Sequence, residues 1–146
     1  MSARRHPVPA AVLLGAAVVV AIGCGRSPTR LETVPVAGRV TLDGRPVAAG
    51  TVLLVPARGR AGQGSIAADG RFAISTYRSA DGGVVGDHRV AVFAAAASPK
   101  TFAEDVAARS WLVPERYANP ETSGLSCTLV AGQAAWLELA LVSEPP

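Results

Sequence analysis

Hydrophobic and polar positions divide this chain into two parts. Residues 10–23 run apolar with Gly15 as the only interruption, whereas from Val34 onward short apolar runs are separated by Gly, Pro and Asp. The second part has little helical periodicity, and short runs bounded by turn residues are typical of β-strands. The pattern therefore predicts one apolar segment near the N-terminus, followed by an all-β domain.

Alternation along the second part locates the strands. Within residues 36–42, Val36, Val40 and Leu42 share one face, while Arg39 and Thr41 lie on the other. Asp-Gly pairs supply the left-handed conformation that tight turns need, and they occur at 43–44 and 69–70, the second being read as a hairpin turn. Seven strands in about 110 residues indicate a two-sheet β-sandwich. We predict these strands at residues 36–42, 50–55, 64–67, 72–76, 89–94, 125–130 and 135–142.

The N-terminal apolar run is too short to cross a membrane as a helix. It holds about 14 residues, whereas a span needs roughly 20 and a signal-peptide core roughly 7 to 15. Arg4 and Arg5 precede the run, and the small residues Ala21 and Gly23 stand just before Cys24. We therefore expect residues 1–23 to be a cleaved signal peptide. The Arg4-Arg5 pair is only superficially like a twin-arginine signal, because His6 and Pro7 follow it.

The cleavage region, Ala21-Ile22-Gly23-Cys24, resembles the lipobox of bacterial lipoproteins. Gly23 and Cys24 match that motif, but Ala21 replaces the usual Leu and Ile22 is unusual, so an ordinary secretory signal is the alternative. The resemblance implies cleavage between Gly23 and Cys24, lipidation of Cys24 and anchoring of the exported protein to a membrane of the cell envelope. Two or more acyl chains anchor a protein stably, whereas a protein with a single chain binds the membrane reversibly. Residues 24–33 then form a polar tether, and Gly25 in place of Asp favours the outer membrane.

Length and charge narrow the class of protein. About 120 residues remain after cleavage, enough for one domain. The leader removes two of the 14 basic residues, leaving 12 against 11 acidic ones, so the isoelectric point near 9.4 does not indicate a basic mature protein. The arginines are scattered singly, whereas nucleic-acid binding needs a clustered basic footprint. We therefore expect no nucleic-acid partner.

Three motifs follow one another along residues 36–92. They are residues 38–52 (G-R-V-T-L-D-G-R-P-V…G-T-V), 68–74 (A-D-G-R-F-A-I) and 86–92 (G-D-H-R-V-A-V). Together they resemble the carboxypeptidase regulatory-like family, whose fold is similar to that of transthyretin, with Gly50 and His88 at positions where Ala and Tyr are usual. Residues 113–117 (V-P-E-R-Y) are similar to a segment of small bacterial lipoproteins of this type. The resemblance implies a non-catalytic β-sandwich over residues 34–146.

Chemistry-bearing motifs are scarce. His6 leaves with the leader and only His88 remains, so a His-rich metal site cannot form. The Asp residues mostly precede Gly in turns rather than following calcium-loop spacing, and no serine lies in a G-x-S-x-G elbow. The C-terminus, Ser143-Glu144-Pro145-Pro146, lacks the Tyr-Arg-Gly-Ser of transthyretin-like hydrolases. We expect no enzyme activity, metal or cofactor.

Cys127 alternates with Leu125 and Leu129, which predicts a buried, unpaired thiol. A bridge to Cys24 is the alternative if Cys24 carries no lipid.

The segment from 98 to 124 is longer than an ordinary sandwich loop, and residues 101–109 match a short helix that begins with a capping box. Trp111 and Tyr117 follow in the same insertion, and Trp136 falls on the outer face of the last strand. We expect the insertion to cover Trp136 as a flap. The alternative is an exposed interaction surface formed by Trp111, Tyr117 and Trp136.

Together these features predict a lipid-anchored envelope protein whose β-sandwich is a structural or protein-interaction module. The alternative is a carbohydrate- or peptide-binding accessory of a separate enzyme. The sequence leaves two kinds of partner open, an envelope protein and a glycan.

Overall fold

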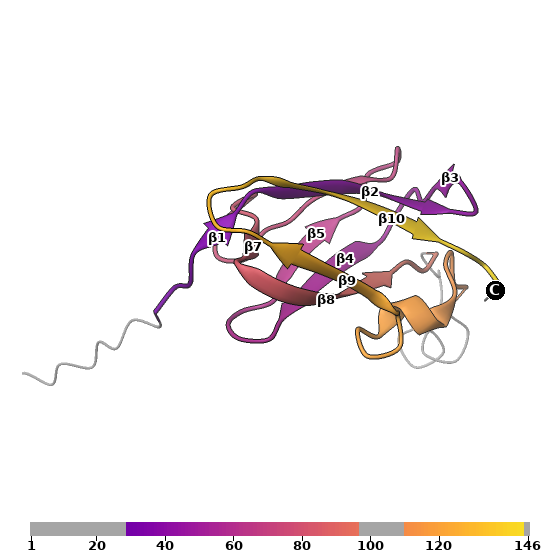
Figure 1. Cartoon of the computed structure of the whole chain (residues 1–146). Coiled ribbons are helices and arrows are strands. Elements are labelled where there is room, and N and C mark those ends of the chain that lie inside the picture. The colour runs from indigo at the N-terminus through magenta and orange to yellow at the C-terminus, as the bar shows by residue number, and fades with distance from the viewer. Residues whose placement is uncertain (1–28, 97–109, 145–146) are drawn as a thin grey trace, which may run out of the picture.

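A computed structural model of the chain describes residues 29–96 and 110–144, and these residues form an all-β fold in two layers (Figure 1). The described residues contain ten strands and one short 3-10 helix, η1 (Glu115–Ala118). The strands are β1 (Thr33–Val34), β2 (Val36–Leu42), β3 (Arg45–Pro46), β4 (Thr51–Pro56), β5 (Gly62–Ser65), β6 (Arg71–Ala73), β7 (Gly83–Val84), β8 (Gly86–Phe93), β9 (Leu125–Leu129) and β10 (Ala135–Leu141).

Two four-stranded sheets make up the layers. In one sheet β2 is central, with β10 parallel to it on one side and β3 and β6 antiparallel to it. The other sheet has the order β5-β4-β8-β9 and is antiparallel throughout. Each of the seven predicted segments overlaps a strand, although β5 and β6 share only two residues each with the predicted segments 64–67 and 72–76. The strands β1, β3 and β7, of two residues each, bring the total in the described residues to ten.

Alternation in the strands places one hydrophobic core between the layers. Val36 and Val40 of β2 are buried as predicted, while Arg39 and Thr41 are only half-buried. Burying such apolar side chains is the main favourable term in folding. The core also takes Val52 and Leu54 from β4, Val90 and Val92 from β8, Leu129 from β9, and Leu139 and Leu141 from β10.

Both predicted Asp-Gly turns are present, but they connect strands differently. Asp43 and Gly44 have φ angles of 49° and 79°, as a two-residue hairpin between β2 and β3 requires. Gly70, with φ of 82°, turns the chain after β5, yet β5 pairs with β4 and β6 pairs with β2. The predicted hairpin turn at 69–70 is formed, because Gly70 N–H donates to the Ala67 carbonyl, Ala67 N–H donates to the Arg71 carbonyl and Gln63 forms an antiparallel bridge with Ser75. The difference is that the main ladders of β5 and β6 lie in different sheets, so the turn also leads from one sheet to the other.

The chain contacts the β domain at Leu31, before Val34, the first residue of the core. The backbone N–H of Leu31 donates to the Tyr77 hydroxyl at 3.2 Å, and Thr33 pairs with Val84 through β1 and β7. The last residues of the predicted tether thus lie against the domain. The predicted signal peptide and Cys24 lie outside the described residues. Within the described part, no helix is long and apolar enough to cross a membrane.

The insertion is described from residue 110 onward, so the helix expected at 101–109 lies outside the described residues. Trp111 forms an isolated antiparallel bridge with Ala95, directly after β8. The η1 helix follows and buries Tyr117. This part of the insertion packs near the end of β8 and the end of β10.

Candidate functional site

Trp136 is the most exposed large hydrophobic residue of the described chain, with 55% of its surface accessible. It lies on the face of β10 opposite Leu139 and Leu141, as the alternation predicts. Its indole Nε1 donates a hydrogen bond to Oε1 of Glu138 at 2.6 Å. The side chain is therefore held in place by a polar partner while its ring stays open to solvent.

The expectation that the insertion covers Trp136 is wrong for the described residues. Tyr117 is buried at the far end of β10, where its hydroxyl accepts from the N–H of Val142 at 3.1 Å. Val142 is six positions beyond Trp136, a distance of about 20 Å along a strand. The insertion packs at that end because the Tyr117 hydroxyl satisfies the backbone just after β10, with the Arg116 guanidinium 4.6 Å from the ring centre.

Trp111 is also removed from Trp136. It is half-buried, and its ring meets that of Phe93 in an edge-to-face contact with centres 5.2 Å apart and planes at 74°. Phe93 ends β8 in the opposite sheet. The alternative, an exposed interaction surface of Trp111, Tyr117 and Trp136, is therefore not formed by the three rings together, because Trp111 and Tyr117 are used in packing.

Small side chains surround Trp136 instead. In the register of the sheet, Trp136 of β10 lies beside Ala37 of β2, which lies beside Ala73 of β6. Two strand spacings make this row about 10 Å wide. A groove of about 410 Å³ follows the row, lined also by Pro35, Val36, Ala80, Ala134 and Ala135. We call this groove and the row Trp136–Ala37–Ala73 the Trp136 face.

A charged row adjoins the Trp136 face. Two positions further along the strands, Glu138 lies beside Arg39 and Arg39 beside Arg71. The Arg39 Nε donates to the backbone carbonyl of Asp69 at 3.2 Å, and Arg71 forms an ion pair with the Asp69 carboxylate at 3.6 Å. The face therefore combines an apolar floor with donors and acceptors of both charges at its edge.

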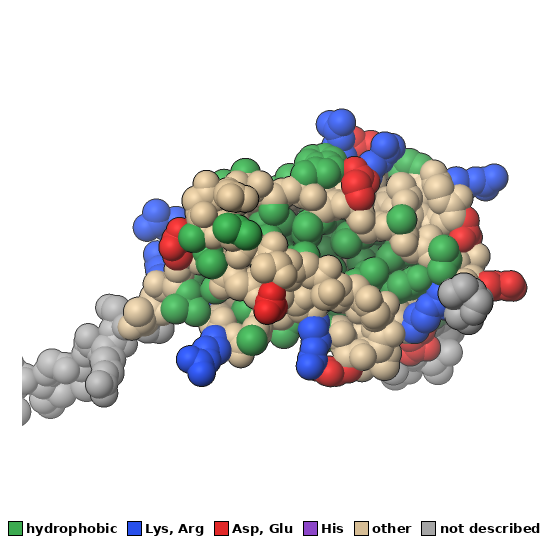
Figure 2. All heavy atoms as spheres, in the orientation of Figure 1, with side chains coloured by type: hydrophobic (Ala, Val, Ile, Leu, Met, Phe, Trp, Pro, Cys, Tyr) green, Lys and Arg blue, Asp and Glu red, His purple; other side chains and the backbone are tan. Residues whose placement is uncertain are grey.

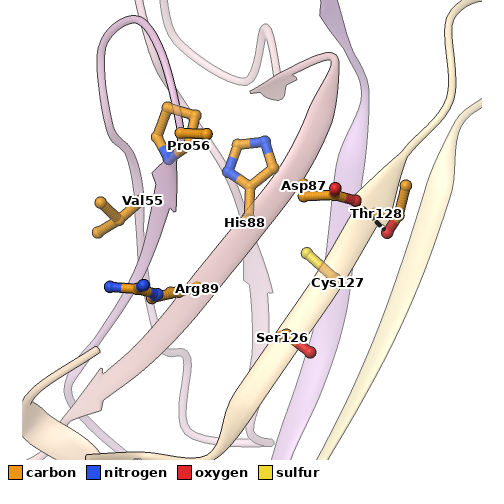
Figure 3. A pocket seen from close by; sticks show the side chains of 9 residues that line it. Val55, Pro56, Asp87, His88, Arg89, Ser126, Cys127 and Thr128 are labelled. Carbon is orange, nitrogen blue, oxygen red and sulfur yellow. Dashed lines mark hydrogen bonds between the residues drawn. The ribbon is translucent and has the colours of Figure 1, made fainter. Parts of the chain in front are cut away.

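A second hollow, of about 580 Å³, lies on the outer face of the other sheet. We call it the saddle (Figure 3). The exposed side chains of Asp87 and Arg89 on β8 and of Ser126 and Thr128 on β9 line it. Asp87 accepts a hydrogen bond from the Thr128 hydroxyl at 2.7 Å. The saddle is open, and its carboxylate is already engaged within the sheet.

His88 is in register with Cys127 across β8 and β9, but its imidazole belongs to the core. The ring is 2% exposed, and Nε2 lies 2.6 Å from the carbonyl oxygen of Val84. A carbonyl only accepts, so Nε2 is the donor in this contact. Nδ1 is buried without a hydrogen-bond partner in the described chain, and the cross-strand neighbour Pro56 has no N–H to offer.

Cys127 is free and shares the inward parity of Leu125 and Leu129, as predicted, but it is only half-buried. β9 is an edge strand, which leaves the thiol partly open to solvent. Burial, and secondarily the charge of Asp87, raise the pKa of the Cys127 thiol to about 11. The thiol is therefore protonated at neutral pH and is a poor nucleophile.

The described residues contain no group of three or more His, Cys, Asp or Glu side chains that could hold a metal ion. Comparison with protein-family models, curated proteins and solved structures gives no match to this chain.

Sequence alternation located Trp136 and Glu138 on one outer face, but it did not show that Ala37 and Ala73 lie beside Trp136. Ala37 and Ala73 belong to strands that were predicted, and their outward parity was readable from the sequence. Their position beside Trp136 depends on the parallel pairing of β10 with β2, for which no local signal exists.

Proposed function

We propose that this chain is a lipid-anchored lipoprotein of the cell envelope, whose β domain is a non-catalytic interaction module that contacts its partner through the Trp136 face. The observation that carries the proposal is the exposed Trp136 ring, fixed by Glu138 beside a floor of alanines. Aromatic side chains of this kind are enriched at the centres of protein interfaces, where burying them stabilises the complex.

Two further observations support the anchor and the family. The sequence Gly23-Cys24 follows an apolar run of signal-peptide length, and the chain meets the domain at Leu31, a few residues later. Two facing four-stranded sheets and the Asp-Gly turn at 43–44 support a carboxypeptidase regulatory-like, transthyretin-like sandwich. In that reading the seven longer strands form the family's framework, and β1, β3 and β7 are additions to it.

A second candidate function is a carbohydrate- or peptide-binding accessory of a separate enzyme. It is favoured by the row of Glu138, Arg39 and Arg71 next to Trp136. Sugars present flat apolar faces and many hydroxyl groups, so an exposed indole beside charged donors and acceptors offers contacts for both.

Mass spectrometry of the mature N-terminus tests the anchor. We expect the wild-type protein to begin at Cys24, to carry acyl mass and to partition into detergent, whereas Cys24→Ser leaves it unprocessed or releases it. An unmodified Cys24, or an intact leader in the mature protein, would contradict the lipoprotein assignment.

Site-specific photocrosslinking in cells tests the contact surface. A photoreactive residue in place of Ala73, on the Trp136 face, should give a discrete adduct that disappears when Trp136→Ala is added. The same residue in place of Ser126, in the saddle on the opposite sheet, is the matched control. Equal adducts at both positions, or none at Ala73, would argue against the Trp136 face.

A glycan titration separates the two candidate functions. Soluble cell-wall oligosaccharides should shift the fluorescence of Trp136 if the accessory reading is right, and Trp136→Phe should abolish the shift while the half-buried Trp111 remains as an internal reference. No shift favours the protein-interaction reading.

A further inference from the structure

Arginines gather at the end of the domain where the chain enters it. Arg30 precedes the first strand, Arg58 and Arg60 lie in the loop between β4 and β5, and Arg78 lies in the loop after β6. All four are exposed. Figure 2 shows arginine side chains projecting from this end of the molecule, beside β1.

Three contacts bring these segments together. The Arg30 guanidinium lies 5.6 Å from the centre of the Tyr77 ring, whose hydroxyl accepts from Leu31 N–H at 3.2 Å. Leu31 lies against Gly59, since a Cβ built at Gly59 would be 2.7 Å from Leu31 Cδ1. A hollow of about 360 Å³ joins the two loops and is lined by Arg60, Tyr77 and Arg78. We call the set Arg30, Leu31, Arg58, Arg60, Tyr77 and Arg78 the arginine end.

No arginine of the arginine end forms an ion pair within the described chain. The ion pairs of the described residues are Arg71–Asp69 and Arg89–Glu121, and neither includes an arginine of this set. The nearby carboxylate of Asp81 accepts hydrogen bonds from the backbone N–H groups of Thr76, Tyr77 and Arg78, so its oxygens face the backbone rather than an arginine. Glu32 is the exposed acidic residue next to Leu31 in sequence. At the centre of the set, Leu31 is 39% exposed and offers an apolar contact.

The short sequence separation between Cys24 and Arg30 determines which end of the domain a lipid on Cys24 would hold near a membrane. Arg30 follows Cys24 by six residues, which span at most about 22 Å when fully extended. A lipid on Cys24 would therefore hold the arginine end, rather than the opposite end with Tyr117 and Val142, next to the bilayer. Basic residues close to anionic headgroups are attracted within a Debye length of about 8 Å at physiological salt.

We propose that the arginine end docks on a bilayer surface that carries anionic phospholipid headgroups, as a second, electrostatic contact beside the lipid on Cys24. This rests on the proposed lipid anchor. The acyl chains hold the protein to the membrane, and the arginines orient the domain on it. Docking in this orientation keeps the opposite end of the domain, with Tyr117 and Val142, away from the headgroups.

Arginine footprinting on vesicles tests the orientation. The mature acylated protein is reconstituted on vesicles of phosphatidylcholine alone or of phosphatidylcholine with phosphatidylglycerol, and modification by phenylglyoxal is followed at each arginine by mass spectrometry. On the anionic vesicles we expect the reaction at Arg30, Arg58, Arg60 and Arg78 to be slower by at least about threefold than on phosphatidylcholine alone. High salt should remove this difference. Arg39, Arg45 and Arg71 should react equally on both.

Two triple variants sharpen the test. Replacing Arg58, Arg60 and Arg78 by Gln should remove the protection of Arg30 on anionic vesicles. Replacing Arg39, Arg45 and Arg71 by Gln is the charge-matched control, which should leave that protection in place. Circular dichroism confirms that both variants are folded.

The outcomes separate the two proposals. Equal reaction rates on the two kinds of vesicle, with the acylated protein bound to both, overturn the docking and leave the anchor standing. A mature protein that carries no acyl mass and does not float with vesicles overturns the anchor and the docking together. Protection that survives in the Arg58, Arg60, Arg78 variant also overturns the docking.

Discussion

The indole nitrogen of Trp136 lies 2.6 Å from Oε1 of Glu138, its neighbour two positions along β10 on the same outer face. This hydrogen bond gives the indole N–H a partner without burying the ring. A Trp that is fixed but 55% exposed contributes little to the core. The residue is therefore available for binding, and its removal should affect recognition more than folding.

Comparing Trp136→Ala with Leu139→Ala tests this division of roles on one strand. We expect Trp136→Ala to change the free energy of unfolding by less than about 1 kcal/mol, as exposed positions do. Leu139, only 7% exposed, should cost about 2 to 5 kcal/mol when truncated, because a cavity is left in the core. Urea unfolding followed by circular dichroism measures both. A loss of several kcal/mol for Trp136→Ala would mean that the ring is covered in solution.

Labelling of Cys127 tests its environment. With a pKa near 11, about one thiol in a thousand is ionised at pH 8, whereas an unfolded cysteine with a pKa near 8.5 is about one-quarter ionised. Alkylation of the native protein should therefore be slower by about 200-fold than in denaturant from ionisation alone, and should accelerate up to about pH 11.

Asp87→Asn tests whether the charge of Asp87 contributes to the raised pKa of Cys127. It removes the negative charge that helps to raise the pKa of Cys127, so native labelling should become faster. Labelling at equal rates in native and denatured protein would contradict the half-buried position of the thiol. Peptide mass spectrometry assigns the label to Cys127 in either case.

Asp81 should make stability depend on acid pH. Burial raises the pKa of its carboxyl, but the hydrogen bonds from the backbone N–H groups of Thr76, Tyr77 and Arg78 together lower the pKa by more. The net pKa therefore lies below the usual value near 3.8. A pKa lowered by folding gives stability that is present above the unfolded pKa and is lost as pH falls through the folded one.

Asp81→Asn is the variant that measures this contribution. At pH 7 it should destabilise the domain by about 1.5 to 3 kcal/mol, the usual value of hydrogen bonds to a charged group. The difference from wild type should shrink as pH falls below about 4, because the Asp81 carboxyl becomes protonated first in the unfolded chain and then, at lower pH, in the folded protein. Equilibrium unfolding at several pH values provides the measurement. A difference that stays constant down to pH 3 would show that the charge is not responsible.

Gly82 controls how the chain enters the domain. It has φ of 89°, and a Cβ there would lie 1.7 Å from the carbonyl oxygen of Val34. Gly82→Ala should therefore separate β1 from β7 and destabilise the fold by at least about 3 kcal/mol. Gly132, with φ of 72° and open space around it, is the matched control, and Gly132→Ala should cost only about 1 to 2 kcal/mol. Thermal unfolding compares the two, and equal losses would mean that strain rather than the close approach to Val34 matters at Gly82.

Local features of the sequence determined the positions of the strands and turns. Alternation in residues 36–42 and 135–141 placed Val40 and Leu139 inward and Trp136 outward, because successive side chains of a strand point to opposite faces. The Asp-Gly pair at 43–44 predicted a turn because its left-handed conformation is a property of those two residues.

Tertiary structure decided what each strand and side chain meets. The parallel pairing of β10 with β2, the separation of β5 and β6 into different sheets and the packing of Tyr117 at Val142 all join residues far apart in the chain. Alternation gives the face of a residue but neither its neighbour across the sheet nor whether that face is covered. For this reason the exposure of Trp136, its alanine floor and the gathering of Arg30, Arg60 and Arg78 emerge only when distant segments are brought together.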